Sequence, residues 1–190
     1  MKSYSAFFAR AENLDRALEI FGEAEPIEGT AWLLCAYDVG ASPPNDDVLW
    51  GRESLTLERS KQVGEIVFVY GDTSTEGFVY EHARDGELLR KLVWFPMLDE
   101  DWTAGWLCVV GTPEDWEQVL FRPDKLESYV DLERMRYEDE GRESEFASRE
   151  AEIRRSWAGG RIEAGTAFPS CDGTVALVVE RSFGIDRGLA

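Results

Sequence analysis

Hydrophobic and polar positions follow alternating strand-like and helix-like patterns over the first part of this chain. The segment 3–9 predicts a strand that carries three aromatic residues. Across 14–21, apolar residues recur with the i, i+3, i+4, i+7 spacing of an amphipathic helix. Asn13 is expected to cap this helix and Gly22 to end it. The continuously apolar segment 31–37 predicts a strand covered on both faces.

The middle of the chain has the pattern of an antiparallel meander. The strands are expected at 66–70, 78–84, 87–94 and 106–110. Asp85-Gly86 is typical of a two-residue hairpin turn, because both positions tolerate the positive φ that such a turn requires. This turn predicts that His82 faces Leu89 and that Glu81 forms an ion pair with Arg90 on the core side of the hairpin.

A helical period replaces the strand pattern after residue 111. Residues 112–115 (Thr-Pro-Glu-Asp) are typical of a helix start, with Thr112 as the cap and proline in the first turn. A charged helical edge is expected at about 124–158, ending at Gly159-Gly160. The apolar segment 175–179 predicts a final strand, at about 174–180.

These elements predict a single α+β domain over 1–190. We expect an antiparallel sheet of about six or seven strands, with helices packed on one face and along an edge.

The net charge of the chain limits the kinds of partner that it can bind. The chain carries 38 acidic side chains against 20 basic ones, a net charge of −18. Such a surface repels nucleic acid and anionic membranes and attracts basic proteins over long range. No apolar stretch resembles a secretory signal or reaches the length of a membrane span, so we expect a cytoplasmic protein without a membrane partner.

Candidate chemistry is sparse. The sequence contains no phosphate-binding loop, dinucleotide fingerprint, nucleophile elbow or zinc-protease motif. His82 is the single histidine, and we expect a half-exposed strand residue rather than a general base. The three cysteines, Cys35, Cys108 and Cys171, lack metal-ligand spacing and are expected to be buried thiols. We therefore expect no catalytic residue, metal site or cofactor.

Acidic clusters are open to a functional interpretation as well. They lie at 46–47, 99–101 and 138–140, and oxygen ligands of this kind suit hard cations or carboxylate catalysis. None has the spacing of a calcium loop. Solvated surface is the interpretation we prefer for all three.

The segment 92–121 stands out because it contains acids and four tryptophans but no lysine or arginine. Tryptophan is frequent at the centres of protein interfaces, and surrounding carboxylates steer a basic partner. Trp94, Trp106 and Trp116 are expected in the core. The predicted partner-binding residues are Asp99, Glu100, Asp101, Trp102 and Asp115.

Part of this region resembles stretches of small, uncharacterised bacterial cytosolic proteins. The residues concerned are the hairpin from Phe78-Val79-Tyr80 through Asp85-Gly86-Glu87-Leu88-Leu89-Arg90 to Trp94, and then Pro113-Glu114-Asp115-Trp116. The resemblance covers about forty residues and implies a bacterial source but no activity.

Two classes of function remain open. The first is a non-catalytic acidic binding protein that docks a basic protein, of the inhibitor or immunity type. The alternative is a small enzyme or ligand-binding domain with a pocket between sheet and helices, using carboxylates, His82, Tyr80, Arg84 or Lys91. The acid excess could instead serve solvation in a saline cytoplasm. Oligomeric state stays open, because apolar edge strands could pair into a dimer.

Overall fold

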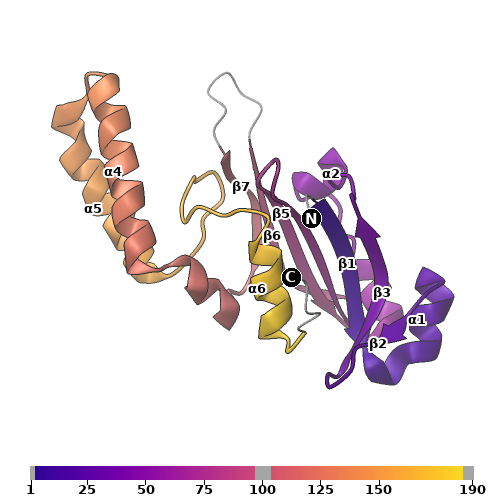
Figure 1. Ribbon diagram of the computed structural model, residues 1–190. Helices are drawn as coiled ribbons and strands as arrows, with labels where there is room; N and C mark the ends of the chain where they lie inside the picture. The colour runs from indigo at the N-terminus through magenta and orange to yellow at the C-terminus, as the bar shows by residue number, and fades with distance from the viewer. Residues whose placement is uncertain (1–2, 97–103, 186–190) are drawn as a thin grey trace.

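The computed structural model describes residues 3–96 and 104–185, and they form an α+β fold around one antiparallel sheet. Seven strands lie in the order β2-β3-β1-β4-β5-β6-β7 (Figure 1). The expected fold class is therefore confirmed. The strands are β1 (Ser3–Arg10), β2 (Glu25–Pro26), β3 (Trp32–Val39), β4 (Glu65–Asp72), β5 (Gly77–Arg84), β6 (Glu87–Pro96) and β7 (Ala104–Gly111).

Helices cover both faces of the sheet. The α-helices are α1 (Leu14–Phe21), α2 (Asp46–Leu49), α3 (Leu57–Val63), α4 (Pro123–Asp139), α5 (Glu143–Gly159) and α6 (Val175–Ser182), and the 3-10 helices are η1 (Ala11–Asn13) and η2 (Asp115–Leu120). The helix predicted at 14–21 is confirmed, and Gly22 ends it with φ of 77°. Asn13 precedes this helix but makes no capping hydrogen bond, since its side-chain amide donates to the Val63 carbonyl instead.

The larger apolar cluster lies under α6 and η2 and is rich in aromatic side chains. Trp94, Trp106 and Trp116 all belong to it, which confirms the core role expected of them. Edge-to-face contacts join these rings, with 5.3 Å between the ring centres of Trp94 and Trp106. On the opposite face, Ala17 of α1 and Val63 of α3 pack in a second buried cluster.

The apolar segment at 175–179 forms α6 rather than the expected strand. Its buried residues are Val175, Ala176, Val179 and Glu180, a pattern that places one helical face on the sheet. Periodicity cannot distinguish a short buried strand from a buried helix turn, and here the packing decides. Gly173 permits the approach, because a Cβ on it would lie 2.4 Å from the backbone of Asp72.

The charged segment at about 124–158 is helical, as expected, but it forms two helices rather than one. Gly141, with φ of 68°, lies between α4 and α5. The two helices pack side by side as an arm that projects from the sheet (Figure 1). Phe146, Ile153 and Trp157 of α5 are buried in a small apolar cluster of this arm.

The β5–β6 hairpin has the predicted turn but a different register. Asp85 and Gly86 both have positive φ, at 50° and 84°, and Ala83 pairs with Leu88 as expected. Beyond that pair Leu89 is an extra residue, a β-bulge, so His82 pairs with Arg90 and not with Leu89. The predicted pairing of Glu81 with Arg90 is therefore wrong.

Candidate functional site

His82 lies at the centre of a buried polar cluster where β5 meets η2. Its Nδ1 is 2.7 Å from Glu114 Oε1, and its Nε2 is 2.9 Å from Glu65 Oε1. The residue is 6% exposed, so the expectation of a half-exposed histidine is wrong. The hairpin pattern could not reveal this environment, because one carboxylate comes from β4 and the other from the start of η2.

Glu114 connects the imidazole to η2. It is the N-cap of that helix, in a reciprocal capping box with Glu117, two residues later than the predicted cap at Thr112. Its Oε2 accepts hydrogen bonds from the Tyr80 hydroxyl at 2.6 Å and from Trp116 Nε1 at 3.1 Å. Burial raises the pKa of Glu114, but the hydrogen bonds from His82 and Tyr80 outweigh it and lower the pKa overall.

Glu65 is the second carboxylate of the cluster, at the start of β4. It accepts hydrogen bonds from Arg84 at 2.6 Å and from Arg10 at 2.7 Å, in addition to His82. Burial opposes ionisation of this carboxyl group. Together, the hydrogen bonds from Arg84, Arg10 and His82 outweigh burial and lower the pKa of Glu65 to about 2.

This geometry does not suit His82 to general-base chemistry. A general base needs a ring nitrogen within reach of a substrate proton, and both nitrogens of His82 are held by carboxylates. Glu81, its neighbour in sequence, lies on the opposite face of β5, as the hairpin pattern indicated. The cluster instead joins four elements of the fold, β1, β4, β5 and η2.

The bulge at Leu89 creates a second buried pair, between Lys91 and Glu81. Lys91 Nζ lies 2.8 Å from Glu81 Oε1, and both side chains are almost fully buried. Glu81 Oε2 accepts hydrogen bonds from the loop before α3. The donors are the hydroxyls of Ser54 and Thr56 and the backbone N–H groups of Leu55 and Thr56. Lys91 also donates to the Glu53 carbonyl at 2.5 Å. The pair fastens this loop to the sheet.

Arg90 points to the other face and binds Glu117 of η2. Its Nε and Nη2 donate to the two carboxylate oxygens at 2.8 and 2.7 Å. Its Nη1 donates to the carbonyls of Val110 and Gly111. With the His82 cluster, this pair gives η2 two buried ionic attachments to the sheet.

In contrast to these buried ion pairs, the surface around α1 and β2 carries exposed acids that are mostly unpaired within the described residues. Both elements lie at one margin of the sheet (Figure 1), and residues 11–30 carry six acids against one base, Arg16. We call these residues the acidic margin: Glu12, Asp15, Glu19, Glu23, Glu25 and Glu28. All six are exposed. Across residues 3–96 and 104–185, Arg16 pairs with Glu19, and no base forms an ion pair with the other five.

The acidic margin was not predicted as a site, although its signal was present in the sequence. A count of charges in short segments finds it directly. Of the predicted partner-binding residues, Asp99, Glu100, Asp101 and Trp102 lie outside the described residues. Asp115 is exposed at the first position of η2, while its neighbours Glu114 and Glu117 turn inward to bind His82 and Arg90.

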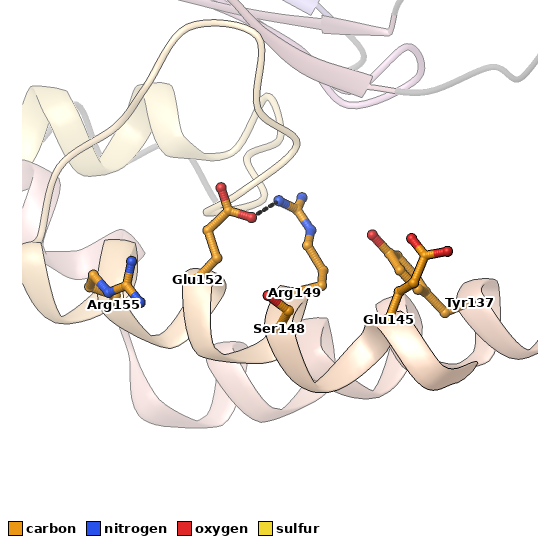
Figure 2. A pocket seen from close by; sticks show the side chains of 6 residues that line it. All are labelled: Tyr137, Glu145, Ser148, Arg149, Glu152 and Arg155. Carbon is orange, nitrogen blue, oxygen red and sulfur yellow. Dashed lines mark hydrogen bonds and ion pairs between the residues drawn. The ribbon is translucent and has the colours of Figure 1, made fainter. Parts of the chain in front are cut away.

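A cavity of about 550 Å³ follows the α4–α5 arm (Figure 2). Its lining residues are Tyr137, Glu145, Ser148, Arg149, Glu152 and Arg155. Basic and acidic groups alternate along it, and Arg149 donates to Glu152 at 2.9 Å. The lining contains none of the residues expected to serve a pocket between sheet and helices, since Tyr80, His82 and Lys91 are buried in the sheet.

The three cysteines, which are the remaining candidate reactive residues, belong to the core. Cys35, Cys108 and Cys171 are free thiols in buried positions, as expected, and burial raises the pKa of Cys35 to about 11. Within the described ranges, no three histidine, cysteine or acidic side chains gather as metal ligands would. No described helix has the length and apolar character that crossing a membrane requires.

Comparison with known proteins gives no relative: no family model, no curated protein and no solved structure matches this chain.

Proposed function

We propose that this protein is a non-catalytic binding protein whose acidic margin docks a basic protein partner. The observation that supports this proposal is the uneven distribution of paired and unpaired charged side chains over the molecule. Most arginines and lysines of the described residues are already in ion pairs with the chain's own acids. The acidic margin keeps five exposed carboxylates that form no ion pair with any base of residues 3–96 and 104–185.

This distribution leaves a local negative field at the acidic margin, where one base accompanies six acids. Such a field accelerates encounter with a cationic protein and orients it before contact. Binding of this kind weakens as salt is added, because exposed charges are screened beyond about 8 Å at physiological ionic strength. The single exposed apolar side chain on this face of α1, Leu18, is 41% exposed and offers the partner an apolar contact beside the carboxylates.

The first test is capture of partners from a lysate of the native organism at low and at high ionic strength. We expect cationic proteins to be retained at low ionic strength and released by salt. Their absence at low ionic strength would contradict the proposal.

A matched pair of variants then separates a site from a general charge effect. Glu12→Gln, Asp15→Asn, Glu23→Gln and Glu25→Gln together neutralise the acidic margin. The control neutralises four other exposed acids on or near the arm that form no ion pair within the described part of the chain, namely Glu138, Asp139, Glu143 and Glu163.

Both variants change the net charge by the same amount. We expect the margin variant to slow association with the captured protein about tenfold at low salt, and the control to change it little. Equal effects of the two variants would place the attraction in the whole-molecule charge. Stability that rises steeply up to molar salt, without any captured partner, would instead favour adaptation to a saline cytoplasm.

A further inference from the structure

The cluster around His82 has a property that goes beyond partner binding. Its imidazole touches two carboxylates that belong to different parts of the fold, Glu65 on β4 and Glu114 at the start of η2. η2 leads directly into α4, so it is the root of the arm. We propose that His82 is a pH-dependent clamp that fastens η2 to the sheet.

The chemistry of the ring makes the clamp sensitive to protons. A neutral imidazole has one N–H group and one lone pair, whereas the imidazolium ion has two N–H groups. Only the doubly protonated ring donates to Glu65 and Glu114 together. When it loses one proton, a nitrogen lone pair faces a carboxylate oxygen at hydrogen-bond distance, and that contact becomes repulsive.

The surrounding groups come from every element packed against the ring. On the Glu65 side lie Arg10 of β1 and Arg84 of β5. On the Glu114 side lie Tyr80 and Trp116. Arg90, the cross-strand neighbour of His82, is bound to Glu117, and Phe183 after α6 packs edge-on with 5.5 Å between ring centres.

These neighbours make the two ends of the clamp unequal. Glu65 keeps two arginine donors when His82 is neutral, and the ring can still donate to one carboxylate. Within the described part of the chain Glu114 has no arginine hydrogen-bond partner, and its other donors are all neutral: the Tyr80 hydroxyl, the Trp116 indole N–H and the backbone N–H of Glu117. Loss of the proton is therefore expected to weaken the attachment at η2 first.

The test is amide hydrogen exchange followed over a pH range that nitrogen NMR of the ring defines, from two N–H groups on His82 at the lower end to one at the upper end. After correction for the intrinsic effect of pH on exchange, we expect amides of 116–120 to exchange about tenfold faster at the upper end, because a charge-assisted hydrogen bond is lost. Amides of β4 and β5 should not change.

Two variants make the outcome decisive. In Glu114→Gln the side-chain amide can donate to Nδ1 of a neutral ring, so η2 should stay protected and the dependence on pH should disappear. In His82→Gln one amide cannot span both carboxylates, so exchange in η2 should be fast at every pH. The proposal is overturned if η2 and β4 exchange together throughout, or if Glu114→Gln keeps the wild-type profile.

Discussion

The ion pairs inside the sheet and those on the α4–α5 arm are made of the same residue types in different surroundings. Arg90 and Lys91 are almost fully buried with their glutamates, whereas Arg154 and Arg142 on the arm pair with acids in open solvent. A buried charge that loses its partner is costly, because it cannot return to water. An exposed pair contributes little, because water and salt replace either partner.

The comparison shows where charge determines the fold. In the sheet, each charged side chain links two elements that are distant in sequence. On the arm, many pairs join neighbouring turns of one helix or the two facing helices. Substitutions in the two regions should therefore differ widely in their effect on stability.

The largest effect is expected from Lys91→Met. It removes the cation from Glu81, which stays buried, and should lower the free energy of unfolding by about 3–5 kcal/mol. Urea denaturation followed by tryptophan fluorescence measures this change. The double variant Lys91→Met with Glu81→Gln should recover part of the loss, since glutamine can still accept hydrogen bonds from the loop before α3. If Lys91→Met lowered the free energy of unfolding no more than a variant on the arm, the contrast between buried and exposed ion pairs would be contradicted.

The second-largest effect on stability is expected from acid, through protonation of Glu65. Its pKa falls from the ordinary 4.5 to about 2 in the folded protein, so the unfolded chain binds more protons between these values. The stabilisation is complete above pH 4.5 and is lost as pH falls towards 2, in total about 3 kcal/mol. Urea unfolding across this range should show the slope, and Glu65→Gln should reduce it. Parallel profiles of the two proteins would exclude Glu65 as the cause.

A smaller effect is expected from Arg90→Lys. The substitution keeps the charge but removes the planar group that binds both oxygens of Glu117 and two carbonyls of β7. We expect a loss of about 2 kcal/mol in the free energy of unfolding, with earlier hydrogen exchange in η2 than in β4. Wild-type stability would show that a point charge suffices at this position.

The smallest effect is expected from Arg154→Gln on the arm. Arg154 contacts Glu127 and Glu150, but all three lie at the surface, and the urea midpoint should not change measurably. The same measurement that detects Lys91→Met serves here. A loss comparable to that of Arg90→Lys would mean that the exposed pairs hold the arm together.

The sequence predicts the elements of this fold better than it predicts their partners. Asp85-Gly86 determines the turn because both positions accept positive φ, and local chemistry is sufficient there. Leu89 carries no mark of a bulge, since an apolar residue in a strand is equally consistent with regular pairing. Its consequence, the exchange of Arg90 and Lys91 between faces, depends on η2 and the loop before α3, which bind them.

The polar cluster around His82 could not be predicted from the sequence either, because it too depends on partners that are distant along the chain. His82 is bound by residues 17 and 32 positions away in the chain, and no local pattern relates them. α6 was mistaken for a strand because its valines have no period of their own over so short a segment. The acidic margin is different, since it depends only on composition and could have been found by counting.

The position of α6 along the chain has a consequence for biosynthesis. This helix follows all seven strands in sequence, yet Val175, Ala176 and Val179 cover the aromatic face that contains Trp94 and Trp106. While the ribosome is still making α4 and α5, η2 is the one described helix on that side of the sheet that has been completed, and it covers only part of the face. Part of this apolar surface therefore stays exposed on the nascent chain until α6 emerges, and such exposed surface favours aggregation.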